Sequence, residues 1–324
     1  MADIRFVQAE SLKEKPADIS KVGFGRVFTD YMFEMDYNPE EGWHDPRIVP
    51  YQEVSLSPAN ATLHYGQAIF EGCKAYRYEG GKAVVFRAKD HIARLNRSAK
   101  ILDIPAVDEK LVYDALMQLI DLEKDWIPDG PGQSLYIRPF IFSTDPYLGV
   151  SVGQYYKLMI ILSPVGAYYA HGFAPVKIMV EDTYVRAPKG GLGAAKTPAN
   201  YAASLHGGLV AHEKGYDQTL WMDGITRRTV LQVCKEWGIP TEERRVSIDE
   251  LIEAYENGKL EEVFGSGTAA VISPVSVLGY QGQDRVISGG KIGEFAQKLY
   301  DYIDGLHTGK EKDVYGFIDV AGEY

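Results

Sequence analysis

Cysteine is scarce in this chain of 324 residues, which contains only Cys73 and Cys234. Two cysteines far apart in the sequence cannot build the disulfide framework of a small secreted domain, and no Cys-x-x-Cys pair is present. We therefore expect two reduced thiols inside a hydrophobic core.

Long apolar runs are also missing. No stretch approaches the roughly 18 residues that a membrane-spanning helix needs. The N-terminal sequence MADIRFVQAESLKEK lacks the apolar core of a signal peptide. These absences predict a cytoplasmic protein that does not enter a membrane.

Basic residues are outnumbered, with 34 Lys and Arg against 45 Asp and Glu and a net charge of -11. A nucleic-acid partner is therefore not expected, because binding a polyanion needs a basic surface. The chain is 45% hydrophobic and 24% charged, which is typical of a globular protein. Its length exceeds what a single core usually supports and predicts two domains.

The first half mixes predicted helices with antiparallel strands. Residues 134–141 (SLYIRPFI) and 156–163 (YKLMIILS) are apolar runs bounded by turn residues, which is typical of strands. Residues 90–102 and 108–122 carry apolar side chains at helical spacing. We assign this half to a smaller N-terminal domain, residues 1–163.

After an aromatic and glycine-containing stretch, residues 164–173, the strand pattern begins again at 176–180. We therefore place a linker at 164–173 and a C-terminal domain at 174–324. In that domain we predict a helix from Thr197 to about Lys214, a strand at 217–222, and a helix from Thr226 that ends before Gly238. Ser247 and Glu250 form a capping box before another helix.

Lys196 lies in the segment RAPKGGLGAAKTPANYAASL, after the glycine-rich residues 190–193 and directly before the predicted helix start. A lysine presented from such a turn can lose part of its hydration, which lowers its pKa and frees the amine to attack an aldehyde. The alternative is a solvated surface charge, and the spacing alone does not exclude it.

Two further segments are candidate anion sites. In GITRRTV (224–230), Ile225 and Thr226 lie at a predicted helix N-terminus, where unpaired amides attract phosphate or carboxylate. In FGSGTAA (264–270), the successive amides of small residues, including Thr268 and Ala269, could form an anion-binding nest. The alternatives are an ordinary helix cap for the first segment and a tight turn between strand and helix for the second.

Three polar side chains stand out in the first half. Arg94 lies opposite Leu95 and Leu102 on its predicted helix, so it could reach a phosphate with both ends of its guanidinium. Tyr136 and Arg138 alternate with apolar residues and point to the same face of their strand. A charged residue in such a strand suggests a polar cavity, and structural pairing with an acid is the competing explanation.

Taken in order, these segments resemble the branched-chain amino-acid aminotransferases of the fold-type-IV pyridoxal-phosphate family. The resemblance covers nearly the whole chain and is carried by FTDYMFEMDY, LHYGQAIFEGCKAYR, HIARLNRSAK, SLYIRPFI, DPYLGV, SPVGAYY, GAAKTPANYAASL, YDQTLWMDG, GITRRTVLQVCKEWGI and FGSGTAAVISPV. The larger class II type is indicated by Lys74 in FEGCKAYR. The resemblance implies an α/β fold of two domains, with an α+β N-terminal domain, an α/β C-terminal domain, the active site between them, and a homodimer.

The resemblance also implies a cofactor, pyridoxal 5'-phosphate, and the residues that bind it. Lys196 matches the Schiff-base lysine that also moves the proton, and Tyr201 matches the residue at the phenolic oxygen of the cofactor. The phosphate would be held by Arg94 and by the backbone at Ile225 and Thr226, with Thr268 also matching a cofactor-binding position.

Substrate residues are implied in the same way. Tyr136 with the amides of Thr268 and Ala269 would hold the α-carboxylate, and Arg138 would bind the second carboxylate of glutamate. The branched side chain would be lined by aromatic residues of this subunit and aliphatic residues of the neighbouring one, namely Phe28, Tyr65, Phe70, Leu148 and Val150. The implied substrates are leucine, isoleucine and valine, with 2-oxoglutarate as the acceptor.

The sequence departs from the family at one junction. The family has a segment of a few tens of residues before GITR, which contains the glutamate that bonds the pyridine nitrogen, whereas here Asp223 is followed directly by Gly224. Residues absent from the sequence, an internal deletion variant and a naturally shortened relative all fit this junction. The rival functions are an impaired cofactor-binding variant, a D-amino-acid aminotransferase and an aminodeoxychorismate lyase.

Overall fold

The computed structural model describes residues 4–166, 173–181, 183–188, 190–220, 225–244, 246–268 and 271–324. The chain divides into two compact units, which we describe separately. The first unit comprises residues 1–167, 186–202 and 306–324, and the second comprises 168–185 and 203–305. The predicted division at 164–173 stays a prediction, since most of that stretch lies outside the described residues.

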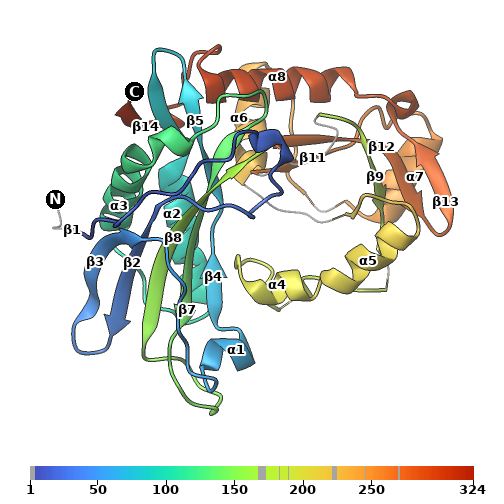
Figure 1. Ribbon diagram of the computed structural model, residues 1–324. Helices are drawn as coiled ribbons and strands as arrows, with labels where there is room; N and C mark the ends of the chain where they lie inside the picture. The colour runs from blue at the N-terminus through green and yellow to red at the C-terminus, as the bar shows by residue number, and fades with distance from the viewer. Residues whose placement is uncertain are drawn as a thin grey trace. The chain divides into compact units, whose positions relative to one another are not determined.

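The first unit is built on a nine-stranded sheet with the order β1-β3-β2-β8-β7-β5-β6-β14, and β4 pairs with β7 beside this path (Figure 1). The β1–β3 pair is parallel and the other pairs are antiparallel. Its strands are β1 (Arg5–Phe6), β2 (Tyr31–Asn38), β3 (Gly42–Pro50), β4 (Ala68–Phe70), β5 (Cys73–Tyr78), β6 (Lys82–Phe86), β7 (Ser134–Ser143), β8 (Tyr156–Val165) and β14 (Ile318–Glu323). Its helices are η1 (Ile19–Lys21), α1 (Ala61–Tyr65), α2 (Ala88–Ile101), α3 (Glu109–Leu122), η2 (Lys124–Trp126) and α4 (Pro198–Ala202).

The two faces of this sheet differ. On the first face, alternate apolar residues of the strands pack against α2 and α3 and form the main core, which includes Phe33, Ile137, Leu95 and Leu116. On the second face, a smaller apolar cluster contains Met32, Val49, Ala68, Phe142 and Met159, with Tyr51, Phe140 and Ile161 packed against it. Because side chains alternate along a strand, Tyr136 and Arg138 also belong to the second face.

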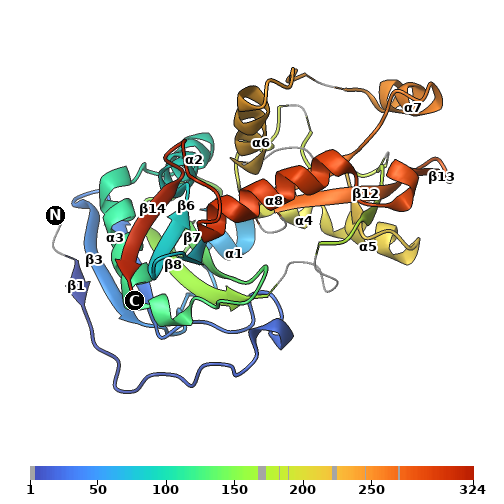
Figure 2. The same ribbon diagram turned by 90° about the horizontal axis from the view of Figure 1, so that it is seen from above.

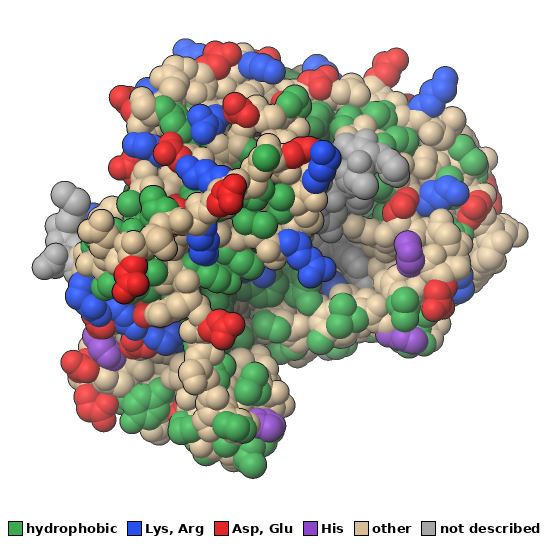
Figure 3. All heavy atoms as spheres, in the orientation of Figure 1, with side chains coloured by type: hydrophobic (Ala, Val, Ile, Leu, Met, Phe, Trp, Pro, Cys, Tyr) green, Lys and Arg blue, Asp and Glu red, His purple; other side chains and the backbone are tan. Residues whose placement is uncertain are grey.

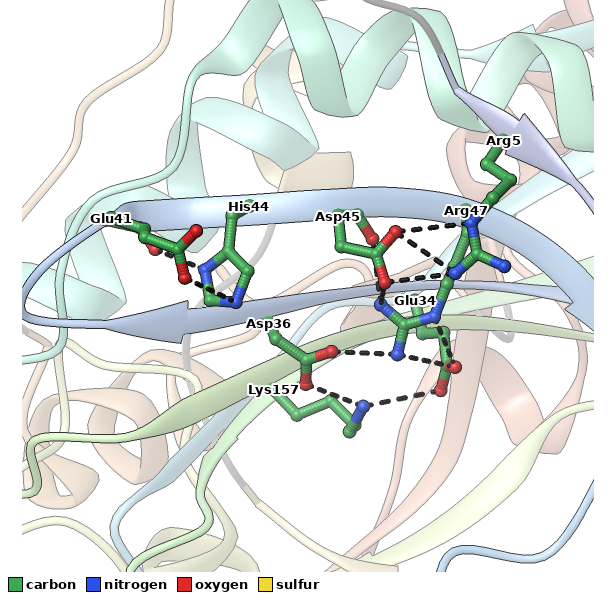
Figure 4. A network of polar contacts seen from close by, with 9 residues as sticks. Arg5, Glu34, Asp36, Glu41, His44, Asp45, Arg47 and Lys157 are labelled. Carbon is green, nitrogen blue, oxygen red and sulfur yellow. Dashed lines mark hydrogen bonds and ion pairs between the residues drawn. The ribbon is translucent and has the colours of Figure 1, made fainter.

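A network of ion pairs covers part of the second face (Figure 4). Arg47 of β3 contacts Glu34 at 2.7 Å and Asp36 at 2.8 Å, and Lys157 of β8 contacts Asp36 at 2.7 Å. Asp45 connects Arg47 to Arg5 of β1. Three adjacent strands and β1 are thereby joined by charges that satisfy one another, so this end of the face is structural in character.

The second unit contains a five-stranded sheet with the order β10-β9-β12-β11, and β13 pairs with β12 beside it. The strands are β9 (Val176–Met179), β10 (Gln218–Thr219), β11 (Phe264–Gly267), β12 (Val271–Tyr280) and β13 (Gln283–Val286). The helices are α5 (Leu205–Glu213), α6 (Ile225–Glu236), α7 (Ile248–Glu256), η3 (Ser288–Gly290) and α8 (Glu294–Thr308), whose last residues belong to the first unit (Figure 2). Its core includes Val176, Ile178, Val275, Leu278 and Ile287.

The α/β fold and the helices and strands of the first half are confirmed, but three predictions for the second half are corrected. The single helix expected from Thr197 to about Lys214 is instead two helices, α4 and α5, which residues 203–204 separate. Gly207 and Gly208 in α5 lower the helix propensity of this stretch. The expected strand at 217–222 is confined to β10 in its described part. The alternative of a tight turn between a strand and a helix is also wrong for FGSG, because Phe264–Gly267 is itself strand β11 and pairs antiparallel with β12.

Surface and core agree with the composition. Among the described residues, no helix is long and apolar enough to cross a membrane. Basic and acidic side chains are interspersed on the face shown in Figure 3. Cys73 and Cys234 are both free and buried, as expected.

Candidate active site

The backbone of Lys196 is held by hydrogen bonds to two other elements of the first unit. Its amide donates to Ser98 Oγ on α2 at 2.9 Å, and its carbonyl accepts from the amide of Phe70 on β4 at 3.0 Å. The next residue, Thr197, is buried and donates its hydroxyl to the carbonyl of Ala68 at 2.8 Å. The lysine at the start of α4 is therefore tied to both α2 and β4.

The amine of Lys196 lies among aromatic rings. Its Nζ donates to Tyr201 Oη at 2.7 Å and lies 4.8 Å from the ring centre of Phe70. The rings of Phe70 and Tyr201 are 4.9 Å apart. Tyr201 is 43% exposed, so this environment is not sealed from water. A half-buried amine held by a phenol at the start of a helix is well placed to bind a carbonyl compound.

Arg138 and Tyr136 lie on the same face of β7, as the strand pattern predicts. Arg138 Nη2 donates to Tyr136 Oη at 3.0 Å, and the guanidinium lies 4.6 Å from the ring centre of Phe70. Burial raises the pKa of Tyr136, and the neighbouring Arg138 opposes that rise. Among the described residues Arg138 forms no ion pair with an acid, which argues against the structural pairing considered above. The guanidinium of Arg138 therefore contacts both the phenol of Tyr136 and the ring of Phe70.

Gly72 provides the space that Tyr136 occupies. A Cβ atom at position 72 would lie 2.0 Å from Tyr136 Oη, which is far inside the van der Waals limit. Any other residue would displace the phenol and with it the hydrogen bond to Arg138. The glycine of the FEG segment is therefore required by close approach rather than by an unusual backbone angle.

Glu71 is a site residue that the sequence did not single out. Its buried carboxylate accepts from Arg94 Nε at 2.5 Å, from Arg94 Nη2 at 2.8 Å and from His91 Nδ1 at 2.8 Å. Burial alone would raise the pKa of Glu71, but the hydrogen bonds from Arg94 and His91 outweigh it and lower the pKa to about 2. Burial lowers the pKa of His91, against the effect of Glu71. One edge of the Arg94 guanidinium is thus engaged by Glu71.

Polar atoms without partners gather on the second face near Tyr136. Arg138 Nε and the hydroxyls of Ser134 and Ser163 are buried and have no hydrogen-bond partner in the part of the chain that the structure describes. Ser163 is paired with Tyr136 across β7 and β8. Buried donors and acceptors are rarely left unsatisfied. These atoms therefore indicate a place where water or a polar ligand completes the hydrogen bonds.

The predicted side-chain pocket is only partly assembled within this unit. Phe70 lies beside Lys196, whereas Phe28 stacks on Tyr51 at 4.9 Å. Tyr65 donates its hydroxyl to the carbonyl of Leu148. Leu148 and Val150 are 59% and 83% exposed, so their apolar side chains are not used in the core of this chain.

The predicted phosphate and carboxylate residues of the second unit occur at the expected local positions. Ile225 begins α6, and Thr226 follows it as a buried residue in the first turn. Thr268 follows β11 in the turn before β12. Ala269 lies outside the described residues, as does the Asp223–Gly224 junction. The roles assigned to these residues stay predictions.

Comparison with known proteins shows the family. The model of the family described as "Amino-transferase class IV" matches residues 68–224. A probable branched-chain-amino-acid aminotransferase of Staphylococcus epidermidis is 48% identical over 349 aligned positions, covering 97% of each chain. The chain belongs to the branched-chain aminotransferase family. Branched-chain-amino-acid aminotransferase 2 of Bacillus subtilis is similar to it at 47% identity, with 96% of this chain and 95% of the relative covered.

A solved structure supports the same conclusion for the fold of this branched-chain aminotransferase family member. The crystal structure of the Escherichia coli branched-chain amino acid aminotransferase aligns with a TM-score of 0.74 at 28% identity. The alignment covers 90% of this chain and 99% of the other. The fold predicted from the resemblance is therefore confirmed.

Proposed function

We propose that this protein transfers the amino group of L-leucine, L-isoleucine or L-valine to 2-oxoglutarate, giving branched-chain 2-oxo acids and L-glutamate. The observation that carries the proposal is the placement of the Lys196 amine against Tyr201 and Phe70, with Arg138 over the same Phe70 ring. A reactive amine, an apolar ring and a cation without an acidic partner are what a pocket for both leucine and glutamate needs.

The residues present fit pyridoxal 5'-phosphate. The Lys196 amine could hold the aldehyde carbon of the cofactor, and Tyr201 Oη, 2.7 Å from that amine, could contact its phenolic oxygen. Arg94 would contribute its guanidinium to holding the phosphate, since a guanidinium matches phosphate oxygens in charge and geometry. When bound, the pyridine ring acts as the electron sink for the reaction.

The side chains of this unit would supply the proton transfer. With the cofactor bound, Lys196 Nζ would be placed to accept the proton of the substrate α-carbon and to hold it for return, because a neutral amine is a competent base. Tyr201 orients the amine through the bond that Nζ now donates, and Phe70 limits its contact with water. The backbone bonds to Ser98 and Phe70 keep the Cα of Lys196 in place while the side chain moves.

Two substrate types would share one pocket through Tyr136 and Arg138. The phenol of Tyr136 would donate to the α-carboxylate of either substrate. The guanidinium of Arg138 would pair with the second carboxylate of glutamate and 2-oxoglutarate, since its buried Nε has no hydrogen-bond partner among the described residues. Leucine, which lacks that carboxylate, would instead contact the aromatic ring of Phe70.

We also propose a cytoplasmic homodimer. The exposed Leu148 and Val150 support it, because solvent-exposed aliphatic side chains in one loop are typical of a surface that another chain covers. In the dimer these residues would line the neighbouring subunit's pocket. Sedimentation of the protein and of a Val150→Asp variant tests this, and a monomeric parent chain would refute it.

The decisive experiment for the function combines product analysis with cofactor mapping. The protein, loaded with pyridoxal 5'-phosphate, is given leucine, and 4-methyl-2-oxopentanoate is detected by mass spectrometry. We expect this product from L-leucine but not from D-leucine, and no turnover of aminodeoxychorismate. Borohydride reduction should attach the cofactor to Lys196. A label on another lysine, such as Lys189, or a preference for the D-isomer would refute the proposal.

A further inference from the structure

Two aromatic residues of the segment between β1 and β2, Phe24 and Phe28, border the second face of the first sheet. The segment follows a long path that contains only the short helix η1 (Figure 2). Near its end, Phe24 meets Tyr136 of β7 edge-on at 4.8 Å, and Phe28 stacks on Tyr51, which follows β3, at 4.9 Å. Phe28 therefore lies beside the end of β3 and Phe24 beside β7, so both ends of residues 24–28 border the face that carries Arg138.

Lys13 holds the end of this segment in place. Its Nζ donates to the carbonyl of Thr29 at 2.6 Å and to that of Phe28 at 3.3 Å, and it lies 4.2 Å from the ring centre of Tyr51. Its backbone amide donates to Asp30 Oδ1 at 2.6 Å. The amide of Tyr51 in turn donates to the carbonyl of Asp30 at 2.8 Å. One side chain therefore joins both partners of the Phe28–Tyr51 stack.

The chemistry of lysine suits this position. An ammonium has three donors, and here it meets two carbonyl oxygens and the face of an aromatic ring. The other lysines of the segment do not do this. Lys21 pairs with Asp18 at 2.9 Å and is 82% exposed, and Lys15 reaches Asp125 only at 3.9 Å.

The segment also borders the apolar cluster that continues toward the candidate active site. Tyr51 packs against the cluster that contains Ala68 and Phe140. Ala68 accepts the hydrogen bond of Thr197, the residue after Lys196. The Phe28 end of the segment and the Phe24 end therefore border the same face, one through Tyr51 and the other through Tyr136.

We propose that Lys13 is a positioning residue that holds residues 24–30 as a wall of the pocket for the branched side chain of the substrate. The proposal rests on the proposed function, because it names one boundary of that same site. Lys13 touches no reacting atom. It acts through Phe28 and Tyr51, and its loss would let the segment leave the face of the sheet.

The test compares Lys13→Met with Lys13→Arg and with the matched control Lys21→Met, all loaded with pyridoxal 5'-phosphate. Methionine keeps the length of the apolar stem and removes the charge, and arginine keeps the charge. The probe is 4-methylpentanoate, an unreactive acid with the side chain of leucine, and its dissociation constant is measured by calorimetry. Amide hydrogen exchange over residues 22–30 is followed in parallel.

For Lys13→Met we expect exchange over residues 22–30 to accelerate and the dissociation constant to rise about tenfold. Exchange around Lys196 should stay at the parent rate. Lys13→Arg should retain most of the binding, and Lys21→Met should match the parent in both measurements.

A Lys13→Met protein that binds the probe as tightly as the parent would overturn the proposal, even if it melts at a lower temperature, because lost stability alone is a structural effect. Accelerated exchange with unchanged binding would also overturn it. If the parent chain itself does not bind 4-methylpentanoate, the proposed function is refuted, and so is the role of residues 24–30 as a pocket wall. If the parent binds it and Lys13→Met binds it equally well, only the positioning role of Lys13 is refuted.

Discussion

Arg138 is the residue through which the two substrate types can be separated. Its Nε is buried and has no hydrogen-bond partner within the described part of the chain, and its Nη2 donates to Tyr136. We expect Arg138→Met to slow the reaction of glutamate and 2-oxoglutarate roughly thirtyfold, a loss of about 2 kcal/mol in transition-state stabilisation, because only these substrates bring a second carboxylate. Leucine should lose much less. Single-turnover rates with each amino acid, followed by cofactor absorbance, measure the ratio.

Leucine serves as the internal control for this substitution. A general disturbance of the pocket would slow leucine and glutamate equally, because Tyr136 is proposed to bind the α-carboxylate of both. Equal losses would therefore show that Arg138 supports the site without reading the second carboxylate.

At the residue scale, the sequence predicts those features that depend on local pattern. Period-two alternation places Tyr136 and Arg138 on one face, and the glycine-rich turn before a helix indicates Lys196. Glu71 could not be predicted in the same way, because its role depends on His91 and Arg94 approaching from α2 across the fold. The only indication in the sequence is that Glu71 directly precedes Gly72, a glycine that close packing against Tyr136 requires.

At the scale of elements, Glu123 couples the end of α3 to the start of β2. It follows the last residue of α3, is 2% exposed, and accepts from the amide of Tyr31. Burial, with a smaller contribution from the nearby Asp30, raises the pKa of Glu123 to about 7, against the lowering effects of Tyr31 and Lys13. The folded protein therefore holds a proton here that the unfolded chain releases above its ordinary pKa of 4.5.

The sign of the resulting pH dependence follows from linkage. A raised pKa in the folded state gives stability that is complete below pH 4.5 and is lost as the pH rises through 7. We expect Glu123→Gln, which stays neutral and can still accept from Tyr31, to be more stable than the parent above pH 7 by up to about 3 kcal/mol. Urea unfolding at pH 5 and pH 8 measures the difference.

The exposed Glu40→Gln variant is the matched control, since Glu40 lies in the turn between β2 and β3. It should follow the parent at both pH values. A Glu123→Gln protein that is no more stable at pH 8 than at pH 5, relative to the parent, would show that Glu123 is charged in the fold.

Elements with strong periodicity were predicted within a few residues. The helix expected at 108–122 is α3 (Glu109–Leu122), and the strand expected at 156–163 is β8 (Tyr156–Val165). The break between α4 and α5 was missed, because Thr197 and Pro198 mark a helix start and nothing as strong marks its end. The path of the N-terminal segment could not be predicted, since it is set by contacts of Lys13, Phe24 and Phe28 with strands distant in sequence.

At the scale of the whole molecule, we propose that the junction between Asp223 and Gly224 limits the activity of the chain. The alignment with the Staphylococcus epidermidis relative spans 349 positions, more than the 324 residues of this chain. The relative therefore carries residues that have no counterpart in this chain. We propose that they include the segment expected at this junction, and with it the glutamate expected at the pyridine nitrogen.

We therefore predict that this chain binds the cofactor but turns over slowly, and that inserting the segment of a close relative between Asp223 and Gly224 restores activity. Without an acidic partner the ring is a weaker electron sink, and a loss of about 4 kcal/mol in transition-state stabilisation slows the reaction roughly a thousandfold. A shift of Lys196 by about 1 Å would slow the reaction by a further factor of order one hundred.

The measurement is a single-turnover reaction with leucine, followed by cofactor absorbance, on this chain and on the repaired one. A third protein carries the same insertion with its glutamate replaced by glutamine, which separates the support of the ring from the repair of the fold. We expect the repaired chain to be fast, the glutamine version to bind the cofactor but react slowly, and the parent chain to be slowest. Full-speed conversion by the parent chain would show that another group supports the ring nitrogen, and the prediction would be wrong.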